Sequence, residues 1–197
     1  MSTTDNSTCI CVARYGEDLN WLQSVKHPVQ ITVYNKGGPN YQTERHMAIN
    51  LSNVGRESHT YLHHIIENYN NLPEYTIFMQ GYPFDHSPNL YATLDRFFST
   101  NDKPAAQHIS EKLIVCNLSG CRHHRGLPLR EVHNEVFGPG TTDKQFIFGA
   151  GAQFLVHKSL ILKHSLSFYQ RCIELVNKEV NPINGFVFER FWGLIFQ

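Results

Sequence analysis

The chain lacks an excess of charge of either sign, a long hydrophobic run and a paired set of cysteines. Seventeen basic residues balance seventeen acidic ones, so no overall field attracts nucleic acid or an anionic membrane. No apolar stretch approaches the roughly 18 residues of a membrane span, and the polar N-terminus does not resemble a secretion signal. We therefore expect a soluble, cytoplasmic protein that neither crosses a membrane nor binds nucleic acid.

Cysteines are few and odd in number, at positions 9, 11, 116, 121 and 172. This set is not typical of a disulfide framework, so reduced thiols are expected. Cys9 and Cys11 lie in an apolar run, where alternate side chains of a strand face the same way and pack as small hydrophobic groups.

Hydrophobic patterning alternates between strands and helices along the 197 residues. Strands are predicted at 8–13, 29–34, 75–79, 113–116, 146–148 and 153–156, and helices after Glu17, after Gly55, at 88–98 and at 159–176. This alternation predicts one α/β domain, residues 1–197, with a Rossmann-like, mostly parallel sheet flanked by helices. Residues 119–142 are expected to form a long loop, and the apolar C-terminus suggests the N-terminal part of a longer polypeptide.

The strongest candidate site joins the start of a helix to the end of a strand. Asn53 and Arg56 offer backbone donors and a guanidinium to a phosphate or carboxylate. Alternatively, Asn53 caps the helix and Arg56 pairs with Glu57 or another surface acid. After the strand at 75–79, Asp85 and His86 supply a carboxylate and an imidazole that suit Mn2+. The alternative is that Asp85 caps the helix that follows.

Two further groups of residues are candidates. Arg14 and Tyr15 follow the first strand, where α/β sheets bind ligands, so Tyr15 could stack on a base or pack at the core rim. No GxGxxG follows that strand, which argues against a classical dinucleotide site. Glycines 149 and 151 favour a close approach of the backbone to a sugar or a neighbouring strand.

Several motifs occur in order along nearly the whole chain. They are Val12-Ala13-Arg14-Tyr15, Tyr34-Asn35-Lys36-Gly37, Asn53-x-Gly55-Arg56-Glu57, Gln80-Gly81-x-Pro83-x-Asp85-His86 and Gly149-Ala150-Gly151-Ala152. With these motifs the chain resembles a family of viral and fungal glycosyltransferase-like domains, best understood in chlorella viruses. The acidic DxD triplet usual in such enzymes is absent, because Gln80, Gly81 and Tyr82 occupy the strand end.

The resemblance implies an enzyme of the GT-A fold that uses a UDP-sugar donor and a divalent ion, Mn2+ or Mg2+. It implies transfer of a hexose or rhamnose to a glycan or glycoprotein acceptor, in such viruses a capsid-protein glycan made in the host cytoplasm. Residues 1–118 would bind the nucleotide-sugar and residues 119–197 the acceptor. The implied metal ligands are Asp85 and His86. The implied nucleotide-sugar contacts are Ala13, Arg14, Tyr15, Asn35, Lys36, Asn53, Arg56, Gln80, Gly81 and Gly151.

Two acids are candidates for catalysis. Glu189 stands among aromatic residues, surroundings that favour a carboxyl group able to take up a proton as the base of an inverting transfer; alternatively, it belongs to the polar face of a terminal helix. Asp143 is the second carboxylate, and the next candidate for the metal should Asp85 not bind it. A non-catalytic carbohydrate-binding or scaffold module is the alternative function, favoured by the missing triplet and the 12% aromatic content.

Overall fold

The computed structural model describes residues 5–38, 46–143 and 145–197. Its first half runs as β1 (Asp5–Arg14), η1 (Asn20–Ser24), β2 (Val29–Asn35), β3 (Met47–Asn50), α1 (Arg56–Asn68), η2 (Tyr69–Asn71), β4 (Tyr75–Gln80) and α2 (Leu90–Ser99). Its second half runs as β5 (Ala106–His108), β6 (Leu113–Asn117), α3 (Leu129–Phe137), β7 (Gln145–Gly149), β8 (Phe154–His157), α4 (Lys158–Ile161), α5 (Leu166–Glu174) and α6 (Ile183–Ile195). The short η elements are 3-10 helices.

The main sheet has six strands in the order β3-β2-β1-β4-β8-β5. Strands β3, β2, β1 and β4 pair in parallel, whereas β8 pairs antiparallel with both β4 and β5. The prediction of an α/β fold is therefore confirmed, with a mixed sheet in which three of the five pairings are parallel. Because β2 and β4 lie on opposite sides of β1, the carboxyl end of β1 is a topological switch point, where such sheets bind ligands.

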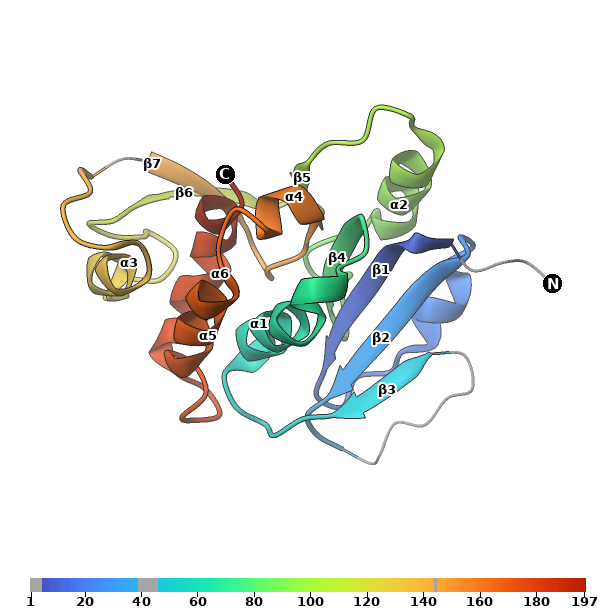
Figure 1. Ribbon diagram of the computed structural model, residues 1–197, viewed down its shortest axis with the longest axis horizontal. Helices are drawn as coiled ribbons and strands as arrows, with labels where there is room; N and C mark the ends of the chain where they lie inside the picture. Colours follow the sequence, from blue (N-terminus) through green and yellow to red (C-terminus); the bar gives the residue numbers. More distant parts are fainter. Residues whose placement is uncertain (1–4, 39–45, 144) are drawn as a thin grey trace.

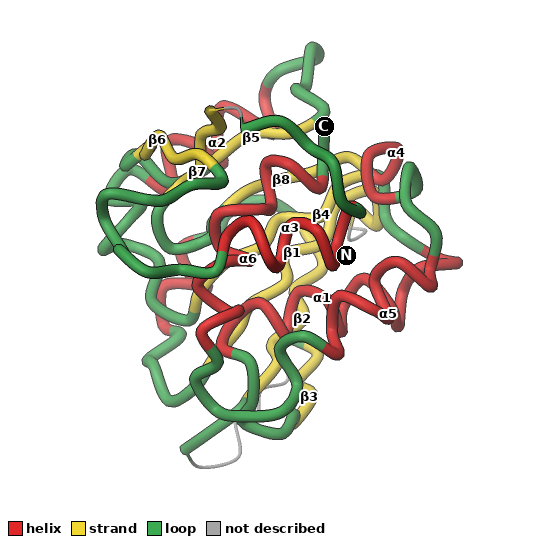
Figure 2. Tube along the Cα trace, turned by 90° about the vertical axis from the view of Figure 1, so that its left-hand side faces the viewer, coloured by secondary structure: helices red, strands yellow, loops and turns green. Residues whose placement is uncertain are grey.

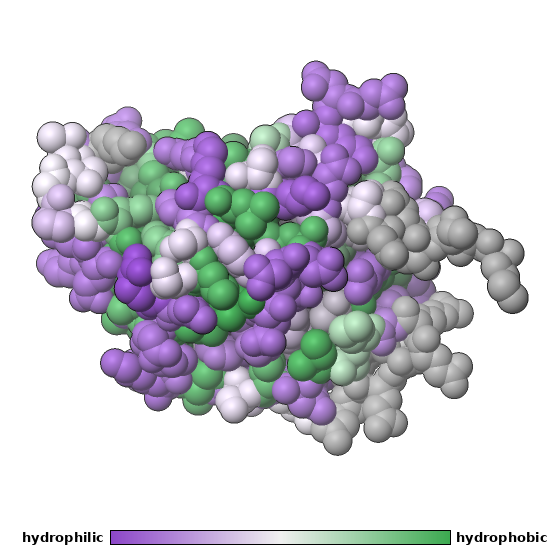
Figure 3. Space-filling model, in the orientation of Figure 1, coloured by the Kyte–Doolittle hydropathy of each residue, from purple (hydrophilic) through white to green (hydrophobic). Residues whose placement is uncertain are grey.

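Helices cover both faces of this sheet. Helices α1, α5 and α6 lie side by side over one face (Figures 1 and 2), and α2 with η1 covers the other. In β1, Cys11 belongs to the first core while Ile10 and Val12 belong to the second. Since both faces are covered, a central strand here reads as a continuous apolar run rather than an alternating one. On the surface in Figure 3, hydrophilic residues are interspersed with small hydrophobic groups.

A second, two-stranded sheet is formed by β6 and β7, which pair antiparallel. It packs against α6, with α3 nearby (Figure 1). Its inward residues, such as Phe146 and Phe148, join the larger core. Leu113, Val115 and Ile147 point outward and are each about half exposed.

The structure corrects five details of the predicted elements, one of which is that β5 was not predicted. The helix expected after Glu17 is a short 3-10 helix, which ends where Val25 takes an extended conformation. The helix expected over 159–176 is two helices, α4 and α5, since the Ser165 hydroxyl accepts a hydrogen bond from the Phe168 N–H and caps a new helix. The long loop at 119–142 contains α3, and β3 was not predicted.

Three of the five cysteines are free, and two form a disulfide. Cys9, Cys11 and Cys172 are free and buried, as predicted. Cys116 and Cys121 form a disulfide, so the expectation that all five thiols are reduced is wrong. Across the described ranges of the chain, the structure contains no helix with the length and apolar character needed to cross a membrane.

Candidate functional site

A cleft of about 710 Å³ lies where β1, β2 and β4 end and α1 begins. Parallel strands bring their carboxyl ends to one edge of the sheet, so loops distant in sequence meet there. The cleft carries cationic, acidic and aromatic side chains together. Its lining residues are Ala13, Arg14, Tyr15, Glu17, Lys36, Asn53, Arg56, Glu57, Gln80, Tyr82, Asp85, Val180 and Asn181. Seven of the ten residues implied for nucleotide-sugar binding are among them.

Arg14 braces the loops that follow β1 and β2. Its Nε donates to the Glu17 carbonyl at 3.0 Å, and its Nη1 donates to the Asn35 side-chain oxygen and to the Gly37 carbonyl. The Asn35 amide in turn donates to the Asn50 side chain of β3 at 3.1 Å. Arg14 and Asn35 are both buried. They fix the shape of the wall, and only Arg14 of the two reaches the cleft lining.

Lys36 holds the start of α1 in place. Its Nζ donates to the carbonyls of Val54 and Arg56 at 2.5 and 2.6 Å. Burial lowers the pKa of Lys36 to about 8, an effect that the nearby Glu57 carboxylate partly opposes. The ammonium is therefore a buried cation that titrates close to physiological pH.

The turn before α1 has an unusual backbone. Gly55 and Arg56 have φ of +66° and +54°, in the left-handed region that glycine tolerates best. A Cβ atom on Gly55 would collide with the carbonyl oxygen of Val176. Gly55 is also the residue that precedes the helix, and no side chain caps α1. The alternative in which Asn53 caps the helix is therefore wrong, and Asn53 lines the cleft instead.

Arg56 ties the start of α1 to the segment before α6. Its Nη1 donates to the Asn181 side-chain oxygen at 2.9 Å. Its guanidinium carbon lies 4.2 Å from the ring centre of Phe186, a cation–π contact. Its Nε lies 3.7 Å from the Glu57 carboxylate, and a third of the side chain is exposed. Arg56 can therefore meet a ligand without leaving these partners.

Glu57 lines the cleft, although the sequence indicated it only as an alternative ion-pair partner of Arg56. It stands inside the Asn53-x-Gly55-Arg56-Glu57 motif, in the first turn of α1. Burial raises the pKa of its carboxyl, and the Arg56 guanidinium only partly offsets this. Functional residues are often acids that lie buried in a cleft and have a shifted pKa. The signal that could have found it is its position beside Arg56 at the helix start.

Asp85 stands on the loop after β4. Buried Gln153 fixes this loop, because its amide donates to the Pro83 carbonyl at 3.0 Å and its oxygen accepts from the Ser87 hydroxyl at 2.9 Å. Asp85 itself is exposed and lines the cleft. Helix α2 begins after Asn89 with no side-chain cap, so Asp85 does not serve as its cap.

The fit to a divalent cation rests on Asp85. Ions such as Mg2+ bind through one or two carboxylates, the rest coming from substrate phosphates and water, and an exposed carboxylate on the cleft fits that requirement. The described part of the chain contains no group of three or more His, Cys, Asp or Glu side chains able to hold a metal ion. The His86 ring packs against Gly151 and does not belong to the cleft lining.

Glu189, on α6, is largely buried and is not among the residues that line the cleft. One of its carboxylate oxygens accepts a hydrogen bond from the Gly151 N–H at 2.7 Å, and the other pairs with Arg190 at 2.8 Å. Gly151, with φ of +81°, packs so closely on His86 and Gln80 that a Cβ atom would collide with the His86 ring. Gly151 thus makes the predicted close backbone contact, and it connects Glu189 of α6 to Gln80 at the end of β4.

Asp143 lies elsewhere. Its carboxylate accepts hydrogen bonds from the Leu118 N–H at 2.8 Å and from the Ser119 hydroxyl. Arg130 lies 3.5 Å away. The Ser119 hydrogen bond is the main cause of a lowered pKa of Asp143. The connection between α3 and β7 that carries it lies at the far left of Figure 1, and the structure does not bring it to the cleft.

Two tyrosines form the rim. Tyr15 and Tyr82 are 59% and 50% exposed, and the Tyr15 ring lies against Gly37, where a Cβ atom would collide with it. Exposed aromatic rings stack on flat ligand faces. The alternative in which Tyr15 packs at the core rim is not what the structure shows. Gly81 stands just below this rim, close to the Glu17 carboxylate.

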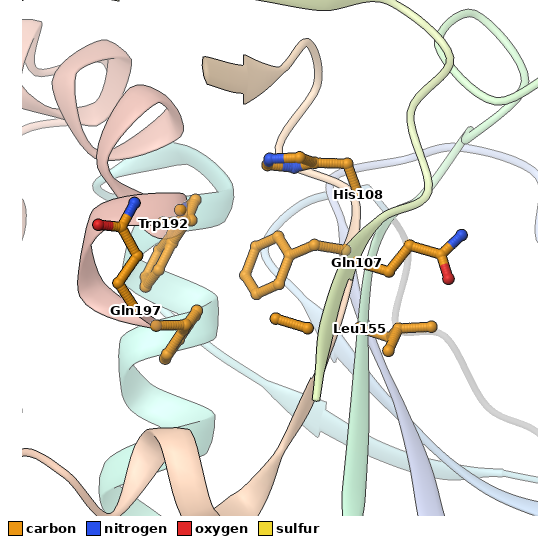
Figure 4. A pocket seen from close by; sticks show the side chains of 9 residues that line it. Gln107, His108, Leu155, Trp192 and Gln197 are labelled. Atoms are coloured by element: carbon orange, nitrogen blue, oxygen red, sulfur yellow. The ribbon is translucent and has the colours of Figure 1, made fainter. Parts of the chain in front are cut away.

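A smaller apolar pocket of about 180 Å³ lies between β5, β8 and α6. Figure 4 shows the His108 ring directed towards the helix that carries Trp192, whereas the Gln107 amide points away. Burial lowers the pKa of His108. The pocket has few polar groups, lies away from the carboxyl ends of the parallel strands and is four times smaller than the cleft. We therefore take the cleft as the candidate site.

One family model matches the chain, at residues 10–115, which is just over half of its length. The chain belongs to the DUF3431 family. This family is described as a protein of unknown function. The DUF3431 match runs from β1 into β6, so it includes every lining residue of the cleft except Val180 and Asn181. Neither a curated protein nor a solved structure matches the chain.

Proposed function

We propose that this DUF3431 protein is a metal-dependent glycosyltransferase that transfers a hexose or rhamnose from a UDP-sugar to a glycan. The observation that carries the proposal is the cleft at the carboxyl ends of β1, β2 and β4, where cations, an exposed carboxylate and exposed tyrosines meet. A GT-A fold, a cytoplasmic place of action and a capsid-protein glycan as acceptor belong to the same proposal and rest on the sequence resemblance.

Each part of a nucleotide-sugar has a chemically suitable neighbour in the cleft. The exposed rings of Tyr15 and Tyr82 suit the flat uracil base. Arg56 and Lys36 are cations beside the helix start, which suits the diphosphate. Asp85 would hold a divalent ion, which supplies charge neutralisation at the leaving diphosphate.

In the proposed reaction, Glu189 takes the proton of an acceptor hydroxyl. The hydroxyl oxygen then attacks the anomeric carbon of the sugar while the bond from that carbon to UDP breaks, which inverts the configuration. The Gly151 N–H and Arg190 hold the Glu189 carboxylate in one orientation. Cationic groups in the cleft stabilise the negative charge that develops on UDP.

A thermal shift measurement tests the nucleotide part of the proposal. UDP with Mn2+, each in large excess, is expected to raise the melting temperature, because a ligand at about 100 times its Kd adds about 2.7 kcal/mol to the free energy of unfolding. UDP without a divalent ion should give a smaller shift. The absence of any shift with UDP would reject the proposed donor.

Turnover tests the catalytic part. Replacing Glu189 by Gln keeps the shape and removes the basicity, so kcat should fall about 100-fold or more with unchanged UDP affinity. Glu179→Gln, an exposed acid whose contact with Gly55 uses its backbone carbonyl, is the matched control. Full turnover in Glu189→Gln would eliminate Glu189 as the base.

A further inference from the structure

Glu57 differs from the other two carboxylates of the cleft. Asp85 is exposed on a loop, and one oxygen of Glu17 accepts the N–H groups of Tyr15 and Gly16 at 2.7 and 3.0 Å. The Glu57 side chain is only 8% exposed, yet it contributes to the cleft lining. It is therefore a nearly buried acid in the wall of the cleft.

The cations beside Glu57 have other partners. Lys36 donates to two backbone carbonyls, and Arg56 donates to Asn181 and stacks on Phe186. The distance of 3.7 Å between the Arg56 Nε and the Glu57 carboxylate makes an ion pair but not a hydrogen bond. Within the described ranges, no other side chain donates a hydrogen bond to this carboxylate.

Two buried polar atoms beside Glu57 also lack hydrogen-bond partners among the described residues, the Arg56 Nε and the Tyr61 hydroxyl. Tyr61 follows Glu57 by four residues and so lies on the same side of α1. Burial raises the pKa of Tyr61, and Glu57 and Glu189 add to this. A buried acceptor beside buried donors costs free energy unless a further group satisfies them.

The immediate surroundings of the Glu57 carboxylate fit a hydroxyl group better than a phosphate. A phosphate in direct contact with this carboxylate would be repelled by it, and by Glu189, whose charge acts on Glu57. A hydroxyl can instead donate a hydrogen bond to a carboxylate. Neighbouring hydroxyls on a sugar ring can therefore donate to the two carboxylate oxygens of Glu57.

We propose that Glu57 is the residue that selects the sugar, by accepting hydrogen bonds from ring hydroxyls of the UDP-linked hexose or rhamnose. This inference rests on the proposed function. It places the sugar at Glu57, in the first turn of α1, next to the Arg56 and Lys36 cations proposed for the diphosphate. Glu57 is then a specificity-determining residue rather than the base.

The test compares UDP with UDP-glucose, UDP-galactose and UDP-rhamnose by calorimetry, in the presence of Mn2+. In Glu57→Gln, the affinity for the preferred UDP-sugar should fall about 10-fold or more, as for loss of a hydrogen bond to a charged group. The affinity for UDP should stay within about twofold. Glu57→Asp keeps the charge but shortens the side chain, and should show the same selective loss. Glu67→Gln, exposed on the same helix, is the control.

Several outcomes would overturn the inference. If folded Glu57→Gln binds the UDP-sugar with unchanged affinity, Glu57 does not select the sugar. If the affinities for UDP and for UDP-sugar fall equally, Glu57 contributes to binding of the diphosphate instead. Binding of the free monosaccharides, followed by NMR, separates this inference from the proposed function. If the wild type ignores UDP but binds a monosaccharide through Glu57, the glycosyltransferase proposal fails and the sugar subsite stands. If neither ligand binds, both fail.

Discussion

The two ends of the cleft differ in how buried their side chains are and in how many partners position them. At the α1–α6 end, Arg56 is fastened to Asn181 and Phe186 while Glu57 is buried beside it. At the β1–β4 end, Tyr15, Tyr82 and Asp85 are exposed. Polar side chains that are fixed by partners and partly desolvated discriminate between ligands. A ligand without the matching group leaves their hydrogen bonds unmade, which costs free energy. Exposed groups can adapt to a metal and a nucleotide.

Replacing Asp85 should have the largest effect on binding. Asp85→Asn removes the exposed carboxylate of the β1–β4 end, so UDP affinity measured with Mn2+ should fall about 100-fold or more, to the value found without the ion. The melting temperature without ligand should not change. The matched control is Asp102→Asn, an exposed acid outside the cleft. Unchanged affinity at the same Mn2+ concentration would move the metal site elsewhere.

Replacing Arg56 should weaken binding less. Arg56→Ala should cost about 1.5–3 kcal/mol for UDP and UDP-sugar alike, the range for a hydrogen bond to a charged group. Calorimetry measures this, with the exposed Arg122→Ala as control. A lower melting temperature with intact UDP affinity would mean that Arg56 only links α1 to the segment before α6.

Replacing one glycine at each end of the cleft by alanine compares how much each end contributes to the free energy of unfolding. Gly55→Ala should lower the free energy of unfolding by about 2–3 kcal/mol, because it forces a left-handed residue against the Val176 carbonyl. Gly16→Ala, at the other end, has no atom within 4 Å of the added Cβ and should change stability by less than about 0.5 kcal/mol. Urea unfolding measures both. Equal changes in the free energy of unfolding would contradict the conclusion that the end of the cleft at the start of α1 is the more rigid one.

The smallest expected effect is a pH dependence caused by Lys36. Its pKa falls from 10.5 to about 8 on folding, chiefly through burial. Between these values the unfolded chain binds more protons than the folded one, so the free energy of unfolding should rise with pH in this window. UDP affinity should fall over the same range by a few-fold, because the buried cation is lost while the phosphates, with a second pKa near 6, stay ionised.

Calorimetry and urea unfolding at pH 7, 8 and 9 follow these opposite trends. Lys36→Arg keeps a charge at every one of these pH values and should remove both. A wild-type UDP affinity that is constant over this range would exclude Lys36 from phosphate binding.

Local patterns sufficed for much of the first half of the chain. The strand β1 and the helix α1, whose buried residues include Tyr61, Leu62 and Ile65, were predicted because strands and helices bury residues at characteristic spacings. The failures have local causes as well. Helix α3 was not predicted within residues 119–142, because Gly and Pro residues flank this short amphipathic segment and are typical of a loop. The break at Ser165 depends on one cap within a continuous pattern.

The site was predicted in part. Residues such as Arg14, Asn53 and Asp85 stand at the ends of predicted elements, and parallel pairing then brings them to one edge of the sheet. The burial of Glu57 could not be foreseen, because it depends on packing between α1 and α6, which are over a hundred residues apart. Asp143 and Glu189 were both catalytic candidates in sequence, but Asp143 lies in the connection between α3 and β7, whereas Glu189 lies in α6.

By itself, the sequence determined the alternation of strands and helices, because each element's apolar spacing is a local property of the chain. It also placed candidate ligand-binding side chains at the element ends. Only the tertiary structure decided which acids share a cleft, which cations are already engaged and how buried each one is. Desolvation and pairing depend on neighbours contributed by distant segments, so the pKa shifts of Lys36 and Glu57 exist only in the folded protein.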